Sequence, residues 1–215
     1  MARKTVGDDR RPAEPGLSRR SFLQGSALAT AGATGLGAAS VLIEQAEAAP
    51  STGLPVVGPQ PVPITLKING ATRTLQVEPR MTLAEALRGP LSLTGTKIAC
   101  DRGAFSACTV WLDGVSVASC MLLTVDVGAR SVTTIEGLAK DGQLHPIQAA
   151  FLEHDALQCG FCTPGMVMSC AALLEHTPHP TAADVRGAIS GHVCRCGTYP
   201  HVIAATLAAA KPRKA

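Results

Sequence analysis

Apolar and polar residues alternate through the middle of the chain with the period of two that is typical of β-strands. Residues 64–68 read Ile-Thr-Leu-Lys-Ile and are followed by Asn69-Gly70, a strong signal for a two-residue hairpin turn. We therefore expect residues 72–77 to return as the second strand of a hairpin. A capping-box pattern at the start of residues 82–87 then predicts a short helix.

Further strands are expected before the pattern changes. Residues 109–112 and 115–119 flank Asp113-Gly114, a second hairpin signal, and residues 132–135 form a last candidate strand. A hairpin, a short helix and more strands, in this order, are typical of a β-grasp ferredoxin-like domain. We place this domain at residues 62–137.

The period changes to that of amphipathic helices in the last third of the chain. Thr163 is the expected N-cap of one helix, with Pro164 at its first position. Thr181 with Asp184 opens another helix, and Gly191 is expected to close it. The predicted helices are 146–157, 163–175, 181–191 and 200–210, which together make an all-α four-helix domain over 138–211. The fold class predicted for the whole chain is α+β.

Composition changes this picture little. The chain has 215 residues, of which 46% are hydrophobic but only 3% aromatic, so the expected core is built from aliphatic and small side chains. The formal net charge is +3 and no basic run with interleaved aromatic residues occurs, so nucleic-acid binding is not supported.

The first 48 residues have the features of an export signal. A basic start containing Arg19-Arg20 is followed by the uncharged, Ala- and Gly-rich stretch 25–43, and Ala46-Glu47-Ala48 matches a small-x-small cleavage pattern. The segment 18–24 resembles the twin-arginine motif, which predicts periplasmic localisation and no membrane span after processing. A membrane anchor is the alternative, because a span needs about 20 apolar residues. Residues 49–61 are rich in Pro and Gly and are expected to form a linker.

Eight cysteines carry the candidate chemistry. In the helical half, Cys159 and Cys162 are separated by two residues, and Cys194 and Cys196 by one. Both pairs come directly before a predicted helix, where free amides favour an anion. Spacing alone leaves a zinc ion and a 2Fe–2S cluster equally plausible. Disulfides are a third alternative, although a bridge within so short a spacing is strained or redox-active.

The residues around these cysteines favour the cluster. The stretches 158–166 (QCGFCTPGM) and 192–199 (HVCRCGTY) resemble the signatures of the xanthine oxidase and aldehyde oxidoreductase family, most closely its periplasmic members. The resemblance implies a small subunit with two 2Fe–2S clusters that works with an FAD-binding subunit and a large molybdenum-cofactor subunit. It also implies that Gln158 contacts the molybdopterin of the large subunit. The thiolates of the helical-domain cluster would be those of Cys159, Cys162, Cys194 and Cys196.

The ferredoxin-like half departs from the family pattern. Cys100, Cys108 and Cys120 match three ligands of the second cluster, but Phe105 stands where the fourth is expected. Three outcomes are open: an oxygen ligand from Ser106 or Asp101, a poorly formed cluster, or no cluster and a disulfide instead. We expect a weakened or altered second cluster.

The predicted function is electron relay in a heteromeric molybdenum hydroxylase that oxidises an aldehyde or an N-heterocycle. Electrons would pass from the molybdopterin centre toward flavin or an external acceptor, and this subunit would do no bond chemistry on substrate. The alternatives are a free-standing exported ferredoxin and an exported binding module held by disulfides. Cys170 is expected to be a buried, inert thiol, while Tyr199 fits a packing role and a cofactor contact equally well.

Overall fold

The computed structural model describes residues 58–210. The predicted signal peptide, 1–48, and most of the predicted linker, 49–61, lie outside the described residues, as does the basic tail 211–215. Among the helices that are described, none is both long and apolar enough to cross a membrane.

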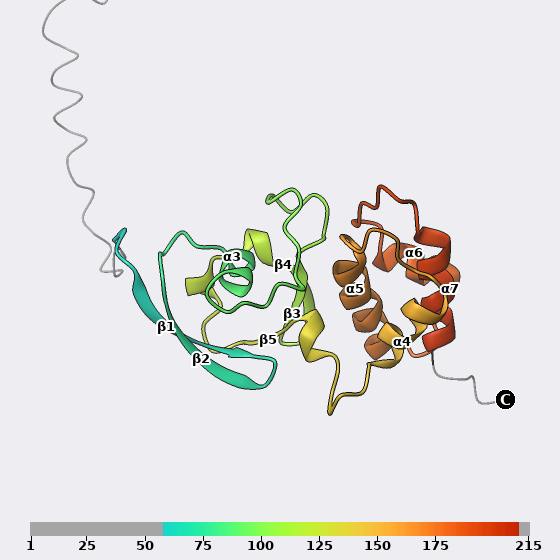
Figure 1. Ribbon diagram of the computed structural model, residues 1–215, viewed down its shortest axis with the longest axis horizontal. Helices are drawn as coiled ribbons and strands as arrows, with labels where there is room; N and C mark the ends of the chain where they lie inside the picture. The colour runs from blue at the N-terminus through green and yellow to red at the C-terminus, as the bar shows by residue number, and fades with distance from the viewer. Residues whose placement is uncertain (1–57, 211–215) are drawn as a thin grey trace, which may run out of the picture. The chain divides into compact units, whose positions relative to one another are not determined.

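A mixed five-stranded sheet forms the first half of the described chain (Figure 1). Its strands lie in the order β2-β1-β5-β3-β4, with β1 and β5 parallel and the other neighbours antiparallel. The strands are β1 (Val62–Ile68), β2 (Ala71–Val77), β3 (Thr109–Leu112), β4 (Val115–Ala118) and β5 (Ser131–Thr133). This sheet agrees with the β-grasp expectation, while the division of the chain into two domains stays a prediction.

Both predicted hairpins are confirmed. Ile68 pairs with Ala71 across Asn69-Gly70, where φ is 51° and 79°. Asp113-Gly114 connects β3 to β4 with φ of 50° and 83°. Positive φ at both central residues matches the twist of the flanking strands, and Asn, Asp and Gly adopt it most readily. The local turn chemistry therefore fixes the register of both strand pairs.

The helix α3 (Leu83–Arg88) covers the core of the sheet. The predicted capping box is present: the Thr82 side chain accepts from the Glu85 amide, and the Glu85 carboxylate accepts from the Thr82 amide. Leu83 and Leu87 are fully buried in the cluster that fills this half. The members of that cluster are Leu66, Ile68, Leu83, Leu87, Val110, Leu112, Val127 and Val132.

Four helices form the second half: α4 (Pro146–Glu153), α5 (Thr163–His176), α6 (Ala182–Ala188) and α7 (Tyr199–Ala209). Their core contains Phe151, the single phenylalanine buried among the described residues, with Met166 and Met168 fully buried beside it. The α+β class is thus confirmed, and the core is as poor in aromatic residues as the composition predicted.

Two predicted helix ends were wrong. The helix α4 stops at Glu153 rather than 157, because Asp155 adopts a left-handed φ of 48° and the Ala156 amide turns back to the carbonyl of Phe151. The helix α6 ends at Ala188 with Ile189 as its C-cap, so Gly191 does not close it.

Two further boundaries differ. The N-cap of α5 is Cys162 rather than Thr163, so Thr163 and Pro164 both lie in the first turn. The strand β5 covers 131–133 rather than 132–135, because Ile135 begins a short 3₁₀ turn. Proline in a first helical turn needs no amide partner, and this explains why the proline remained a reliable signal.

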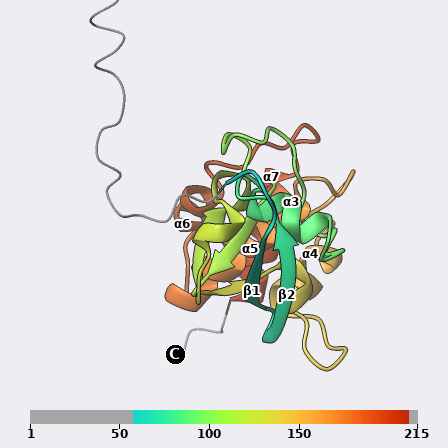
Figure 2. The same cartoon turned by 90° about the vertical axis from the view of Figure 1, so that its left-hand side faces the viewer.

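The helix α5 packs against the sheet at β3 and β4. The indole nitrogen of Trp111 on β3 donates to the carbonyl of Met168 at 2.9 Å. A Cβ at Gly165 would lie 2.3 Å from the carbonyl oxygen of Ser106, so glycine permits this close approach. Figure 2 looks onto the β1–β2 hairpin, with α5 behind it and α6 to its left. The packing of α5 against the sheet brings the cysteine-containing loop 100–108 next to the helical half.

Candidate metal centre

The cysteines of the helical half lie on two loops that meet. Cys159 and Cys162 are on the loop between α4 and α5, and Cys194 and Cys196 on the loop between α6 and α7. The thiols of Cys162 and Cys194 are hydrogen-bonded, and Cys159 is close enough to interact electrostatically with Cys162. The structure thus pairs the thiols of Cys162 and Cys194, with Cys159 nearby on the first loop, while Cys196 shares the second loop with its side chain half-buried.

The two central thiols differ in acidity. Burial, with the neighbouring Cys194 thiol, raises the pKa of Cys162 to about 12. Burial also acts to raise the pKa of Cys194, but hydrogen bonds from the Thr198 hydroxyl and the amides of Thr198 and Gly197 outweigh it and lower that pKa to about 7. The Thr198 hydroxyl lies 3.4 Å from the Cys194 sulfur. The loop therefore favours the thiolate of Cys194 more than an ordinary cysteine would, and the thiolate is the form that binds metal.

Two glycines shape these loops. Gly160 has φ of 79° and Gly197 has φ of 73°, in the left-handed region that side chains rarely adopt. A Cβ at either position would meet nothing within 4 Å. Glycine is therefore required here by backbone conformation and not by lack of space.

Tyr199 holds the second loop from inside. Its hydroxyl accepts the Cys194 amide at 2.8 Å and donates to the His192 carbonyl at 2.9 Å. His192 is itself buried, with its Nε2 2.8 Å from the Ser169 hydroxyl. This role could not be predicted from the sequence, because a tyrosine beside a cysteine is equally compatible with packing.

The first cysteine loop reaches the surface. Gln158 and Cys159 are exposed, and the Phe161 side chain is 47% exposed. An apolar groove of about 270 Å³ begins beside Gly160. It is lined by Ile135, Leu144, Gln148, Phe151, Leu152, Leu157, Gly160, Thr163, Pro164 and Val167.

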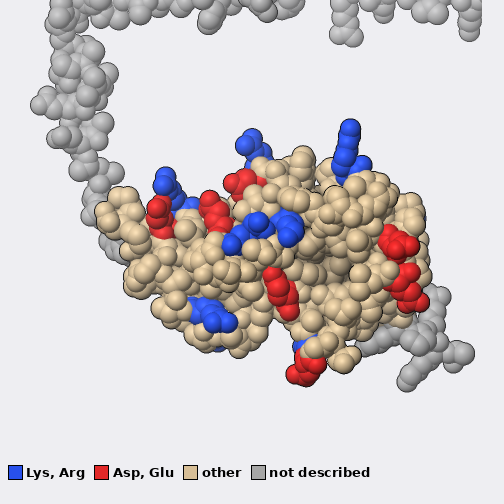
Figure 3. Space-filling model, viewed as in Figure 1, with Lys and Arg blue, Asp and Glu red and all other residues tan. Residues whose placement is uncertain are grey.

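Charged side chains of both signs are interspersed on the face in Figure 3, with wide uncharged areas between them.

A second set of thiols gathers in the ferredoxin-like half. The buried thiols of Cys108 and Cys120 are hydrogen-bonded, and Cys100 interacts electrostatically with Cys120. The amides of Gly103 and Ala104 donate to the sulfurs of Cys120 and Cys100 at 3.3 and 3.2 Å. Burial raises the pKa of Cys120 to about 11, whereas backbone hydrogen bonds, that of Arg102 first, lower the pKa of Cys100.

Two other features lie apart from these thiols. Cys170 is fully buried in α5 against the Thr206 hydroxyl, and burial raises its pKa to about 11.

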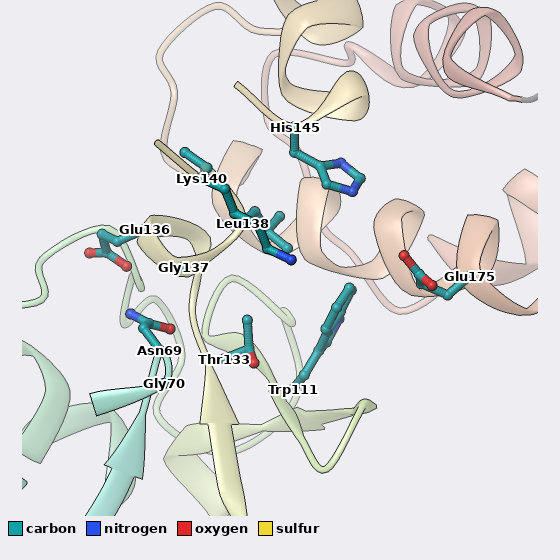
Figure 4. Close-up of a pocket in the computed structure, with 11 residues that line it drawn as sticks. Asn69, Gly70, Trp111, Thr133, Glu136, Gly137, Leu138, Lys140, His145 and Glu175 are labelled. Atoms are coloured by element: carbon teal, nitrogen blue, oxygen red, sulfur yellow. The ribbon is translucent and has the colours of Figure 1, made fainter. Parts of the chain in front are cut away.

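A pocket of about 500 Å³ beside the β1–β2 turn is lined by Trp111, His145, Glu175 and others, none of them a cysteine (Figure 4). Within residues 58–210, no group of three or more His, Cys, Asp or Glu side chains lies in an arrangement that could hold a metal ion.

Residues 134–207 match the family model of a [2Fe-2S] binding domain. The chain is 40% identical over 209 residues to the aldehyde oxidoreductase iron-sulfur-binding subunit PaoA of Escherichia coli O157:H7, covering 90% of this chain and 88% of the relative. It is 47% identical over 146 residues to the nicotine 6-hydroxylase small subunit of Paenarthrobacter nicotinovorans, covering 68% and 88%.

Solved structures agree with these relatives. Quinoline 2-oxidoreductase from Pseudomonas putida 86 superposes with a TM-score of 0.68 at 43% identity, covering 70% of this chain and 94% of that one. The aldehyde oxidoreductase of Desulfovibrio gigas superposes with a TM-score of 0.66 at 36% identity, covering 69% of this chain but only 17% of that one.

Proposed function

Because the chain belongs to the family of iron–sulfur subunits of molybdenum hydroxylases, we propose that it relays electrons from a molybdopterin centre on a large partner subunit. The observation that carries this proposal is the meeting of two cysteine loops in the helical half, where the thiols of Cys162 and Cys194 touch. Four cysteines on two loops are the donor set that a 2Fe–2S cluster uses.

The residues present fit such a cluster. Cys159, Cys162, Cys194 and Cys196 would hold it, and when bound it would supply one-electron chemistry. The chain's own contribution is to place the sulfurs and to stabilise their charge. The Thr198 hydroxyl and the amides at the start of α7 surround Cys194, while burial of Cys162 keeps water from one side of the site.

The exposed edge of this site supports contact with a partner. By its resemblance to the family, Gln158 would reach the pterin of the large subunit, and its side chain is exposed directly before Cys159. The apolar groove beside Gly160 and the exposed ring of Phe161 offer a surface that a large subunit would cover. The cluster would then be the first electron acceptor after the molybdenum centre.

The complex as a whole is proposed to hydroxylate an aldehyde or an N-heterocycle with oxygen from water. The names of the relatives include both substrate classes. An FAD-binding subunit is proposed as the next electron acceptor, and export by the twin-arginine route as the way in which the folded subunit reaches the periplasm.

The test is cysteine replacement in the purified complex. Cys162→Ser and Cys194→Ser should each remove the cluster signal from the electron paramagnetic resonance spectrum and lower the iron content. Cys170→Ser is the matched control, because that buried thiol is hydrogen-bonded to Thr206 and lies outside the site. Retention of the full signal in the Cys162 and Cys194 variants, or failure of the chain to copurify with a molybdenum subunit, would contradict the proposal.

A further inference from the structure

The ferredoxin-like half has three of the four cysteines that a cluster site needs. Cys108 and Cys120 are in contact, Cys100 is close to Cys120, and the amides of Gly103 and Ala104 point at sulfur. The Cys108–Cys120 pair and the two amides are therefore in place, with Cys100 nearby. What decides the state of this site is whether the chain supplies a fourth ligand.

Phe105 occupies the fourth position of the expected pattern. A phenyl ring has no donor atom for iron, and Phe105 is 42% exposed. Its carbonyl oxygen accepts the Val193 amide at 3.4 Å, which ties this part of the loop to the helical half. A one-residue shift of the loop would break that bond.

Ser106 is the nearest oxygen donor in the sequence, but its hydroxyl lies against the helical half instead of the thiols. Its hydroxyl lies 3.2 Å from where a Cβ on Gly191 would be, in the helical half. Its carbonyl oxygen accepts from the Thr109 hydroxyl at 2.7 Å and packs against Gly165. The backbone at Ser106 is left-handed, with φ of 52°, so moving this residue along the loop into the position of Phe105 would disrupt the contact between the halves.

Asp101 is the other candidate oxygen ligand. It follows Cys100 directly, in a left-handed conformation with φ of 53°, and its side chain is exposed. Oxygen from a solvated carboxylate is a poorer ligand than thiolate for the softer iron of such clusters. The residues of this half therefore do not fit a four-thiolate cluster.

We infer that the ferredoxin-like half does not hold a 2Fe–2S cluster, rather than the weakened or altered one expected from the sequence, and that the subunit carries a single cluster, in its helical half. Cys108 and Cys120 then remain as a buried pair of thiols in contact, and Cys100 as a half-buried thiol. This inference rests on the proposed function, since it presumes that the helical half is loaded.

The experiment measures iron, sulfide and paramagnetic signals in the purified complex, for the natural chain and three variants. The natural chain should give about two irons per small subunit and one reduced-cluster signal. Phe105→Cys should give about four irons and a second signal. Ser106→Cys, whose sulfur would face Gly191, and Phe105→Ala, which removes the ring without adding a donor, should both match the natural chain.

The outcomes separate the two claims. About four irons and two signals in the natural chain would overturn the single-cluster inference and leave the proposed relay intact. Failure of Phe105→Cys to gain iron, in a complex that retains its first signal, would show that the missing cysteine is not the cause. Absence of iron from the natural complex would instead reject the proposed function itself.

Discussion

The hydroxyl oxygen of Tyr199 lies 2.8 Å from the backbone nitrogen of Cys194 and accepts its hydrogen. The same hydroxyl donates to the carbonyl of His192, so one side chain closes the loop on both sides of Val193. The next helix, α7, begins at Tyr199. The loop that presents Cys194 is therefore fixed to the helix that follows it.

We expect Tyr199→Phe to alter the cluster proposed at this site. Removing the hydroxyl frees the Cys194 amide and the His192 carbonyl, and the loss of such bonds costs about 1 kcal/mol each. The stability of the subunit should fall, and the midpoint potential and the reduced signal of the cluster should both shift, as a spectroscopic redox titration would measure.

Trp111→Phe is the matched control for that variant. It also removes one aromatic hydrogen bond, from the indole nitrogen to the Met168 carbonyl, but at the contact between β3 and α5. It should lower the unfolding temperature without moving the potential. Equal shifts of the potential in both variants would mean that Tyr199 acts only through general stability.

Gln158→Ala is expected to slow electron transfer from the large subunit and to leave folding unchanged. The side chain is exposed in the isolated subunit, so its removal should change the free energy of unfolding by no more than about 0.5 kcal/mol. Stopped-flow reduction of the cluster by substrate is the measurement. Gln143→Ala, in an exposed turn away from the cysteines, is the control, and equal rates in the two variants would contradict a contact with the pterin.

The helix α4 should lose part of its stability at mildly acidic pH. The Nδ1 atom of His145 accepts the Ile147 amide as the N-cap of this helix, an interaction that requires the neutral ring. Burial lowers the pKa of His145, aided by Lys140 and opposed by Glu175. The unfolded chain, with a histidine pKa of about 6.5, therefore binds this proton before the folded chain does.

The contribution of His145 is complete above pH of about 6.5 and is lost as the pH falls toward the lower pKa of the folded state. Thermal unfolding between pH 8 and about 5 should show the decline. His145→Asn retains a capping side chain without a titrating ring, so its decline should be smaller, and an unchanged slope would contradict the assignment.

Local chemistry in the sequence anticipated much of this fold. Asn69-Gly70 and the Thr82 capping box fix their conformations within a few residues, so they could be identified without tertiary information. The early end of α4 depends on the left-handed conformation of Asp155. An aspartate within a helical pattern does not indicate by itself that its backbone will be left-handed. Boundaries set by single backbone angles are for this reason the least predictable part of the fold.

The candidate site likewise has features that the sequence predicts and features that depend on tertiary contacts. The spacing from Cys159 to Cys162 predicted the first pair, because neighbouring positions determine which thiols share a loop. The position of the Ser106 hydroxyl could not be predicted, because it lies against Gly191 in the other half of the chain. The two hydrogen bonds of Tyr199 are equally non-local in origin, since they depend on how the loop before α7 closes.

The twin-arginine prediction concerns residues outside those described and can be tested on its own. Arg19→Lys combined with Arg20→Lys should leave the subunit in the cytoplasm, since the motif is read as an arginine pair and conserving the charge does not replace it. Arg10→Lys with Arg11→Lys is the matched control, because it changes a second arginine pair in the same basic region. Fractionation with immunodetection should find the first variant in the cytoplasm and the control in the periplasm. Equal export of both would show that positive charge alone directs the leader, as in a general secretory signal, and the subunit would then have to acquire its cluster after crossing the membrane.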